Sequence, residues 1–280
     1  MNRPVEQEAS HSTDKSAAVA RARSRGPVAL PAIHALIAVA SGKGGVGKST
    51  VAANLAAAFA ARGRRVGLLD ADIYGPSIPR MMGIGGTPVS AGRDRIQPLV
   101  SHGITCMSIG FVVGEADPVI WRGPLVARTI EQLLTEVDWG PLDVLVIDLP
   151  PGTGDAQLTL AQRAPLTGAV IVSTPQDIAL SAARKGLHMF QKVGVPVFGL
   201  IENMSYFICP HCGARTDIFA HGGAQREAER LGTTFLGEIP LDMRIRETSD
   251  GGTPIVIAEP ESPQAQAFLA IADRVWPKAA

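Results

Sequence analysis

A glycine-rich segment near the start of the chain constrains its fold more than any other feature. Residues 42–50 read Gly-Lys-Gly-Gly-Val-Gly-Lys-Ser-Thr, and they directly follow the apolar run Leu36–Ser41. A strand, a glycine-rich turn and a helix in this order form a phosphate-binding loop, in which backbone N–H groups point at phosphate oxygens. The helix that begins near Ser49 adds the positive end of its dipole. We therefore predict a strand–loop–helix unit that binds a nucleotide.

Two side chains at the end of this loop suit the phosphates and their metal. Lys48 supplies a mobile cation for the terminal phosphates, and Ser49 supplies a hydroxyl group for Mg²⁺. Lys43 occupies a variable position of the general pattern, where a lysine is usually a solvated surface charge. The predicted nucleotide-binding residues of the loop are Gly42, Lys43, Gly44, Gly45, Val46, Gly47, Lys48, Ser49 and Thr50.

After the loop, apolar runs alternate with helical patterns. Several runs are apolar throughout, as expected for strands buried on both faces of a parallel sheet. The alternation predicts an α/β fold, a doubly wound and mainly parallel sheet with helices on both faces, which binds its ligand at the carboxyl ends of the strands. The predicted strands are Leu36–Ser41, Arg65–Asp70, Ile104–Ile109, Val144–Asp148, Ala169–Ser173, Val197–Glu202 and Phe235–Ile239, and the predicted helices are Ser49–Arg62, Pro124–Val137, Ile178–Val193, Gln225–Leu231 and Ser262–Val275.

The first 34 residues differ in composition from the rest. They are rich in Ala, Ser, Arg and Glu and show neither a helical nor a strand period. We predict a disordered tail at residues 1–34 and one P-loop domain at residues 35–280. The acids Glu6, Glu8 and Asp14 among the arginines of the tail argue against an organelle transit peptide. We therefore expect a cytoplasmic protein, with the mitochondrial matrix as the minor alternative.

Charge and cysteine content narrow the possible partners. The chain has 26 basic and 26 acidic residues, so its formal net charge is zero. This balance argues against a general grip on nucleic acid or on an anionic membrane. No apolar run in the sequence is long enough to cross a bilayer. Three cysteines exclude a disulfide scaffold and favour a reducing compartment.

Acidic residues follow two of the predicted strands. Asp148 ends an apolar strand, and a carboxylate in that position beside a phosphate loop holds Mg²⁺ through water. The backbone of Gly152, four residues later, is placed to sense a γ-phosphate. Asp70 and Asp72 follow the second strand, and for both the alternative role is a helix cap or a turn. The Asn-Lys-x-Asp string by which many GTPases select guanine is absent, so we expect ATP.

The segment Cys209-Pro-His-Cys212 carries different chemistry. A Cys-x-x-Cys pair is half of a metal site, a redox dithiol or a chance spacing. A redox dithiol usually opens a helix, whereas this pair lies in a loop-like region near residues 205–216. Pro210 and Gly213 favour a tight turn that holds both thiolates toward one metal centre.

The number of ligands limits what this pair can hold alone. A [4Fe–4S] cluster or a structural zinc needs four ligands, and the pair supplies two. His211 and His221 could complete a zinc site within one chain. Cys106 lies inside a predicted strand, where a cysteine behaves as a small apolar residue.

These segments together carry a resemblance to a known family. Lys43 marks the deviant phosphate loop of the MinD/ParA/nitrogenase-iron-protein class, and Asn-Met-Ser followed by Cys-x-x-Cys narrows the likeness further. From about residue 36 to residue 276 the chain resembles the Mrp/ApbC family of iron–sulfur cluster carrier ATPases and is similar to its mitochondrial NUBPL-type members. The matching strings are Ser41-Gly-Lys-Gly-Gly-Val-Gly-Lys-Ser-Thr, Asp70-Ala-Asp-Ile-Tyr-Gly-Pro-Ser, Trp121-Arg-Gly-Pro, Asp148-Leu-Pro-Pro-Gly-Thr-Gly-Asp, Ser173-Thr-Pro-Gln and Glu202-Asn-Met-Ser-Tyr-Phe.

The resemblance implies roles for individual residues. It implies a nucleotide-sandwich homodimer, in which Lys43 reaches the nucleotide of the partner. It also implies that Asp72 orients the attacking water, that Asp70 lies nearer the Mg²⁺ shell and that Asn203 contacts adenine. Pro240 is a further candidate for the wall of the base pocket. The expected catalytic residues are Lys43, Lys48, Asp72 and Asp148, and the expected metal ligands are Ser49 and Asp70 for Mg²⁺ and Cys209 and Cys212 for the cluster.

A dimer changes the ligand count at the cysteine pair. Symmetry brings two pairs together and supplies four thiolates for one bridging [4Fe–4S] cluster. The resemblance then implies ATP-driven transfer of a labile cluster to apo iron–sulfur proteins, with cluster scaffold proteins as further partners. We expect neither nucleic-acid binding nor stable membrane association.

Two alternatives stay open at this point. One is a MinD/ParA-like positioning ATPase that acts at a membrane or on DNA. Such a protein needs a basic amphipathic helix or a basic patch, and the predicted last helix carries only Arg274 as a base. The other is an ATPase with a structural zinc in the cysteine loop.

Overall fold

A computed structural model describes residues 27–92, 95–111 and 123–280 of the chain. Eight strands form one sheet in the order β12–β9–β8–β1–β7–β2–β6–β5. All neighbouring pairs are parallel except β5 and β6, which are antiparallel. The strands are β1 (Ile33–Ser41), β2 (Val66–Asp70), β5 (Leu99–Ser101), β6 (Ile104–Ser108), β7 (Leu142–Asp148), β8 (Gly168–Ser173), β9 (Val197–Glu202) and β12 (Phe235–Glu238).

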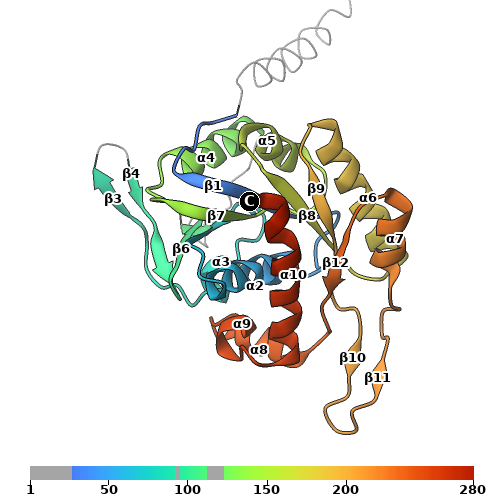
Figure 1. The fold of residues 1–280 in the computed structure, drawn as a ribbon. Helices are drawn as coiled ribbons and strands as arrows, with labels where there is room; N and C mark the ends of the chain where they lie inside the picture. Colours follow the sequence, from blue (N-terminus) through green and yellow to red (C-terminus); the bar gives the residue numbers. More distant parts are fainter. Residues whose placement is uncertain (1–26, 93–94, 112–122) are drawn as a thin grey trace, which may run out of the picture.

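Helices cover both faces of this sheet (Figure 1). The α2 helix (Lys48–Ala61) packs on one face with α3 (Ile78–Met81), α8 (Met243–Asp250), α9 (Ile255–Ala258) and α10 (Pro263–Ala279). The other face carries α4 (Gly123–Thr135), α5 (Asp155–Arg163), α6 (Asp177–Lys192) and α7 (Gly223–Leu231). A short 3₁₀ helix, η1 (Ile109–Phe111), follows β6.

The two cores follow from the alternation of side chains along the central strand β1. Ala35, Ile37 and Val39 point into the core beneath α2 and α10, and the intervening Leu36 and Ala38 point into the core on the opposite face. Both sets are almost inaccessible to solvent, which is why the strand reads as a continuous apolar run. The predicted doubly wound α/β fold is confirmed.

Two short antiparallel strand pairs extend from the sheet (Figure 1). One pairs β3 (Val89–Gly92) with β4 (Arg95–Gln97), and the other pairs β10 (Phe207–Ile208) with β11 (Arg215–Thr216). The second pair carries the Cys-x-x-Cys motif in its turn. We call residues 205–220, which contain this pair, the cysteine ribbon.

The start of the folded part differs from the prediction. β1 begins at Ile33, and the backbone N–H of Val28 donates to the carbonyl of Arg163 at 2.9 Å. The predicted boundary at residue 34 is therefore too late, because packing against α5 orders the chain before it. Residues 1–26 lie outside the described residues, so the disorder of the tail stays a prediction. In the described part of the chain, no helix is long and apolar enough to span a membrane.

Candidate functional site

The phosphate loop connects β1 to α2, as predicted, and two of its glycines are required by close neighbours. A Cβ atom at Gly42 would lie 2.0 Å from the backbone carbon of Ala182 in α6. Gly47 has a φ of +80°, and a Cβ atom there would lie 2.1 Å from Nδ2 of Asn203. Only glycine lets the loop pass between these groups. The loop borders a cavity of about 210 Å³, which is lined by Ser41, Gly44, Gly45, Gly47, Lys48, Ser49, Thr50, Asp72, Ser77, Met81 and Pro151.

Lys48 is the centre of a buried polar cluster. Its Nζ lies 2.7 Å from Oδ1 of Asp148 and 3.1 Å from Oδ2 of Asp72. It also donates to Oγ of Ser49 at 3.3 Å. Burial by itself lowers the pKa of Lys48, but the carboxylates of Asp148 and Asp72 outweigh this effect and raise the pKa. The structure thus brings together four residues that were predicted from separate parts of the sequence.

Asp148 has a free coordination position. The residue is fully buried at the end of β7, and its Oδ2 atom has no hydrogen-bond partner among the described residues. Burial raises the pKa of Asp148, while the adjacent Lys48 opposes the rise. An unpaired carboxylate oxygen near the Ser49 hydroxyl is the oxygen-rich setting that Mg²⁺ or its bound water requires. The donor set therefore fits a magnesium ion.

Asp70 has a different environment from the one expected of a magnesium ligand. Its Oδ1 accepts from the backbone N–H of Asp72, and its Oδ2 accepts from the N–H of Ile78 and from Ser108 Oγ, all at 3.0–3.1 Å. Burial, together with the charge of Asp148, raises its pKa to about 7. Both oxygens are thus committed to the turn between β2 and α3, so the geometry supports the turn-capping alternative for this residue.

The predicted γ-phosphate contact of Gly152 also meets a competing bond. Its N–H donates to the carbonyl of Ser41 at 2.9 Å, which ties the segment after β7 to the end of β1. This bond has to break before the N–H can reach a phosphate. Lys43 is half-buried, and its carbonyl accepts from Ser41 Oγ at 2.9 Å. Within the described residues its ammonium group forms no ion pair.

Asn203 is hydrogen-bonded to the backbone of the phosphate loop. Its Nδ2 donates to the carbonyl of Val46 at 2.8 Å, and its backbone N–H donates to Ser173 in β8 at 2.8 Å. The residue thus lies beside the nucleotide cavity, while its contact with adenine stays a prediction.

Pro240 is buried just after β12, where the carbonyl of the preceding Ile239 accepts from the N–H of Ser205 at 3.0 Å.

The cysteine ribbon presents its two thiols at the surface. Cys209 is half-buried and Cys212 is exposed, and neither is in a disulfide. The backbone N–H of Gly213 donates to the Cys209 carbonyl at 2.9 Å, and the +71° φ of Gly213 closes the turn. Backbone N–H groups of Cys212 and His211 lower the pKa of Cys209, which favours the thiolate that binds metal. Cys106 is fully buried, and burial raises its pKa to about 12, as expected for an inert thiol.

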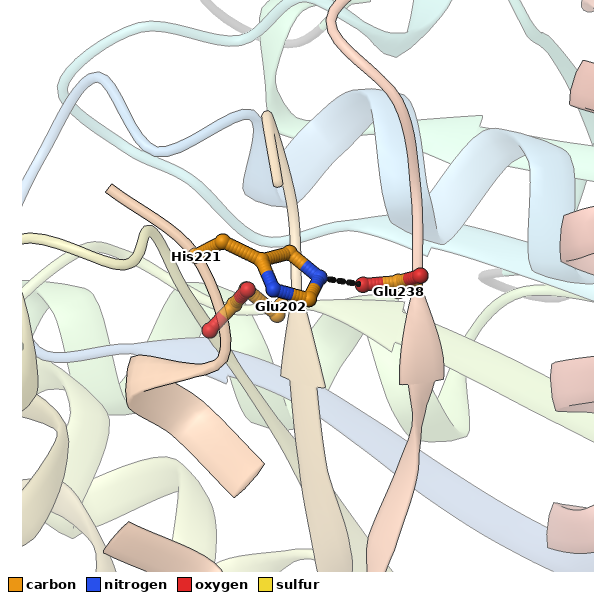
Figure 2. Close-up of side chains that lie close together, drawn as sticks. All are labelled: Glu202, His221 and Glu238. Atoms are coloured by element: carbon orange, nitrogen blue, oxygen red, sulfur yellow. Dashed lines mark hydrogen bonds and ion pairs between the residues drawn. The ribbon is translucent and has the colours of Figure 1, made fainter. Parts of the chain in front are cut away.

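Sequence reasoning missed one cluster, at the base of this ribbon. Glu202 ends β9, Glu238 ends β12, and His221 follows the ribbon; their ligand atoms all lie within 4.8 Å of one another (Figure 2). In the parts of the chain that the structure describes, this is the one group of three such side chains close enough for a metal. Within those parts, His211 and His221 do not join the two cysteines in such a group. The only sequence signal for the cluster is a glutamate at the end of one predicted strand, Glu202, and another one residue before the end of the next, Glu238.

Comparison with known proteins decides the family. A family model described as ParA, NUBPL iron-transfer P-loop NTPase, matches residues 32–276. The chain belongs to this family. It is 54% identical over 250 residues to the iron-sulfur cluster transfer protein NUBPL of Dictyostelium discoideum, across 89% of this chain and 77% of the relative. It is 52% identical over 254 residues to the iron-sulfur cluster carrier protein of Haemophilus influenzae, across 90% of this chain and 69% of the relative.

A solved structure agrees with the membership in the NUBPL iron-transfer family. It is the nucleotide-binding protein from Archaeoglobus fulgidus in complex with ADP, in which cobalt was found. It is 43% identical in sequence and superposes with a TM-score of 0.73, covering 85% of this chain and 93% of the other. The resemblance inferred from the phosphate loop and the cysteine pair is thereby confirmed.

Proposed function

We propose that this protein is an ATP-dependent carrier that assembles a labile [4Fe–4S] cluster between two subunits and transfers it to apo iron–sulfur proteins. The observation that carries the proposal is the surface position of Cys209 and Cys212 on a domain that also holds a phosphate loop. The relatives at 52–54% identity are named as iron–sulfur cluster transfer and carrier proteins, which supports the iron–sulfur function over a positioning ATPase or a structural zinc. Two thiols per chain supply half of the cluster ligands, so a symmetric homodimer supplies all four.

Hydrolysis in this proposal uses the buried cluster around Lys48. Lys48 neutralises charge on the terminal phosphates. Ser49 and Asp148, the latter through water, would hold a Mg²⁺ ion, which would offset further charge on the phosphates. Asp72, 3.1 Å from Lys48, orients the water that attacks the γ-phosphorus while the bond to the bridging oxygen of ADP breaks. Lys43 of the partner subunit's loop completes the charge around the phosphates. Asn203 and Pro240 border the adenine, and Asp70 keeps the turn that carries Asp72 in place.

The cluster is the cargo, and it has to be held loosely. Cys212 is exposed and Cys209 half-buried, so an acceptor protein can reach the ligands directly. Thiolates of an acceptor replace those of the carrier one at a time, and no electrons need to be exchanged. Cluster scaffold proteins are the proposed source. We place the protein in the cytoplasm, with the mitochondrial matrix as the alternative, and with neither nucleic acid nor a stable membrane contact.

Anaerobic reconstitution with ferrous iron and sulfide tests the proposal. We expect the wild type to take up about four irons per dimer, since one bridging cluster needs four ligands. The Cys209→Ala variant is expected to lose this iron, whereas Cys106→Ala, which removes a buried thiol, is expected to keep it. A wild type that binds no iron, zinc in place of iron after anaerobic purification, or a Cys209→Ala variant that holds as much iron, would contradict the carrier function.

A further inference from the structure

One buried carboxylate joins the two ends of the cysteine ribbon. Glu202 is the last residue of β9 and is inaccessible to solvent. Its Oε1 accepts from Ser205 Oγ at 2.7 Å and from the N–H of Gly222 at 2.8 Å, and its Oε2 accepts from the N–H of Ala224 at 2.6 Å. Ser205 lies where the chain enters the ribbon, and Gly222 and Ala224 lie where it returns. A single side chain therefore fixes both roots of the segment that carries the thiols.

A second carboxylate, on the neighbouring strand, extends this network toward solvent. Oε2 of Glu238 lies 2.9 Å from Ser205 Oγ and 2.7 Å from Nε2 of His221 (Figure 2). The Ser205 hydroxyl has one proton for two carboxylates, so it donates to Glu202 or to Glu238 but not to both at once. His221 and Glu238 are each about one-third exposed, at 36% and 34%, whereas Glu202 is closed off. The network therefore has a fixed inner half and an outer half that can rearrange.

The observed hydrogen bonds use most of the oxygen lone pairs of Glu202. Three donors already occupy Glu202, and its Oε1 accepts two of them. Oε1 therefore has no lone pair left for a cation while Ser205 donates to it, whereas Oε2, which accepts one bond, has one left. A role in holding the backbone explains the observed bonds without a bound ion.

The residue after Glu202 connects the same strand end to the phosphate loop. Nδ2 of Asn203 donates to the Val46 carbonyl at 2.8 Å, and Gly47 approaches this nitrogen so closely that no side chain fits between them. A shift of the loop when phosphate enters therefore has to move Asn203 or break its bond. Asn203 and Glu202 are adjacent in the chain, so a single peptide unit separates the bond to the phosphate loop from the residue that holds the ribbon roots.

We propose that Glu202 is a positioning residue for cluster transfer: it holds the roots of the ribbon in the arrangement that presents Cys209 and Cys212, and it conveys the occupancy of the phosphate loop from Asn203 to them. This inference rests on the proposed carrier function, because the thiols matter only if they hold the cluster. Adjacency alone does not demonstrate coupling between two sites, so the test has to measure coupling directly.

The test compares cluster release with and without nucleotide. Wild type, Glu202→Gln and Ser205→Ala are reconstituted, and loss of the cluster to an iron chelator is followed by absorbance with and without Mg-ATP. We expect Mg-ATP to change the wild-type rate by at least about twofold. Glu202→Gln, which keeps the shape but places an NH₂ group toward backbone N–H donors, is expected to lose this response while still binding ATP. Glu229→Gln, on the exposed side of α7, is the matched control and is expected to respond as the wild type does.

Ser205→Ala is a milder second variant, for the case in which Glu202→Gln does not fold. It removes one hydroxyl group from the network and leaves the bonds of Glu202 to Gly222 and Ala224 intact. If either variant folds, binds ATP and retains the wild-type response, the positioning role is wrong. Hydrogen exchange of the amides of residues 205–222, with and without ADP, gives a readout that needs no cluster. A nucleotide-dependent change in the wild type that disappears in Glu202→Gln supports the inference even if reconstitution fails, and its absence in the wild type overturns it.

Discussion

The ammonium nitrogen of Lys48 lies 2.7 Å from a carboxylate oxygen of Asp148, and both side chains are almost completely buried. Removing one partner of such a pair leaves an uncompensated charge in the interior, at a cost of about 3–5 kcal/mol. We expect Lys48→Met to lower the free energy of unfolding of the nucleotide-free protein by this amount, measured by urea denaturation. Adding Asp148→Asn should recover part of the loss, because it neutralises one of the two stranded carboxylates.

An exposed ion pair provides the comparison for Lys48. Arg62 and Asp273 form a 2.7 Å pair in which both side chains are about half-exposed. Because solvent screens such pairs, Arg62→Met is expected to lower the free energy of unfolding far less than Lys48→Met does. Equal losses for the two variants would show that the Lys48 cluster is solvated rather than buried.

Asp70 should make stability depend on pH. Its pKa is raised from 3.8 to about 7, so folding favours the protonated carboxyl. The stability that this proton contributes is fully present below pH 3.8 and is lost as the pH rises through about 7. Asp70→Asn cannot lose a proton. As the pH rises from 3.8 to about 7, the wild type should therefore lose stability relative to the Asp70→Asn variant. Above that range the difference between their free energies of unfolding should stay constant.

Asp143 is the control for this pH dependence, because its shift has the opposite sign. Hydrogen bonds from Arg65 lower its pKa to about 2, so its contribution is present above pH 3.8 and falls only below that value. Asp143→Asn should consequently show a constant difference between pH 4 and pH 7. A slope of the same size in both variants would contradict the assignment to Asp70.

Two glycines of the phosphate loop should respond very differently to alanine. The added methyl group at Gly42 would lie 2.0 Å from the α6 backbone, whereas at Gly44 nothing lies within 4 Å. Overpacking of this kind costs about 1–3 kcal/mol, and we expect Gly42→Ala to lower the melting temperature of the nucleotide-free protein accordingly. Gly44→Ala should stay within about 0.5 kcal/mol of wild type. Equal effects would mean that the loop does not pack against α6 as observed.

A mixing experiment tests whether Lys43 acts on the partner's nucleotide. Lys43→Ala and Asp72→Ala should each be inactive as ATPases. In a mixed dimer, the subunit that lacks Lys43 keeps Asp72 and receives Lys43 from its partner, so one of its two sites is complete. Random mixing should restore up to about a quarter of wild-type activity, since half of the dimers are mixed and each has one working site. No recovery, with mixed dimers shown to form, would place Lys43 in its own subunit's site.

Much of the fold can be predicted because its determinants are local in sequence. Leu36–Ser41 is a continuous apolar run, and β1 buries it on both faces. The α5 helix is not predicted, because its sequence is largely polar and only part of it packs inward. The strands β10 and β11 have two residues each, too few to show a period. Their presence depends on pairing across the turn.

The residues of the candidate site also divide into those that the sequence predicts and those that only the fold reveals. Lys48, Ser49 and Asp148 can be predicted because a short loop and a strand end carry their own signals. The network of Glu202, His221 and Glu238 cannot, since it depends on β9 and β12 being neighbours in the sheet. The capping role of Asp70 likewise requires Ile78 and Ser108 to lie beside it, which only the folded chain reveals.

The exposed turn of the cysteine ribbon also determines how the protein is damaged. A thiol with a lowered pKa at the surface reacts readily with peroxide, first to a sulfenic acid and then to a disulfide with a neighbouring thiol. Cys209 has the lowered pKa and Cys212 is three residues away, so the empty carrier is the form at risk. In the proposed dimer, a bound cluster would cover the same sulfur atoms. Sensitivity to peroxide is therefore a direct consequence of an accessible turn, and peroxide should inactivate the unloaded protein.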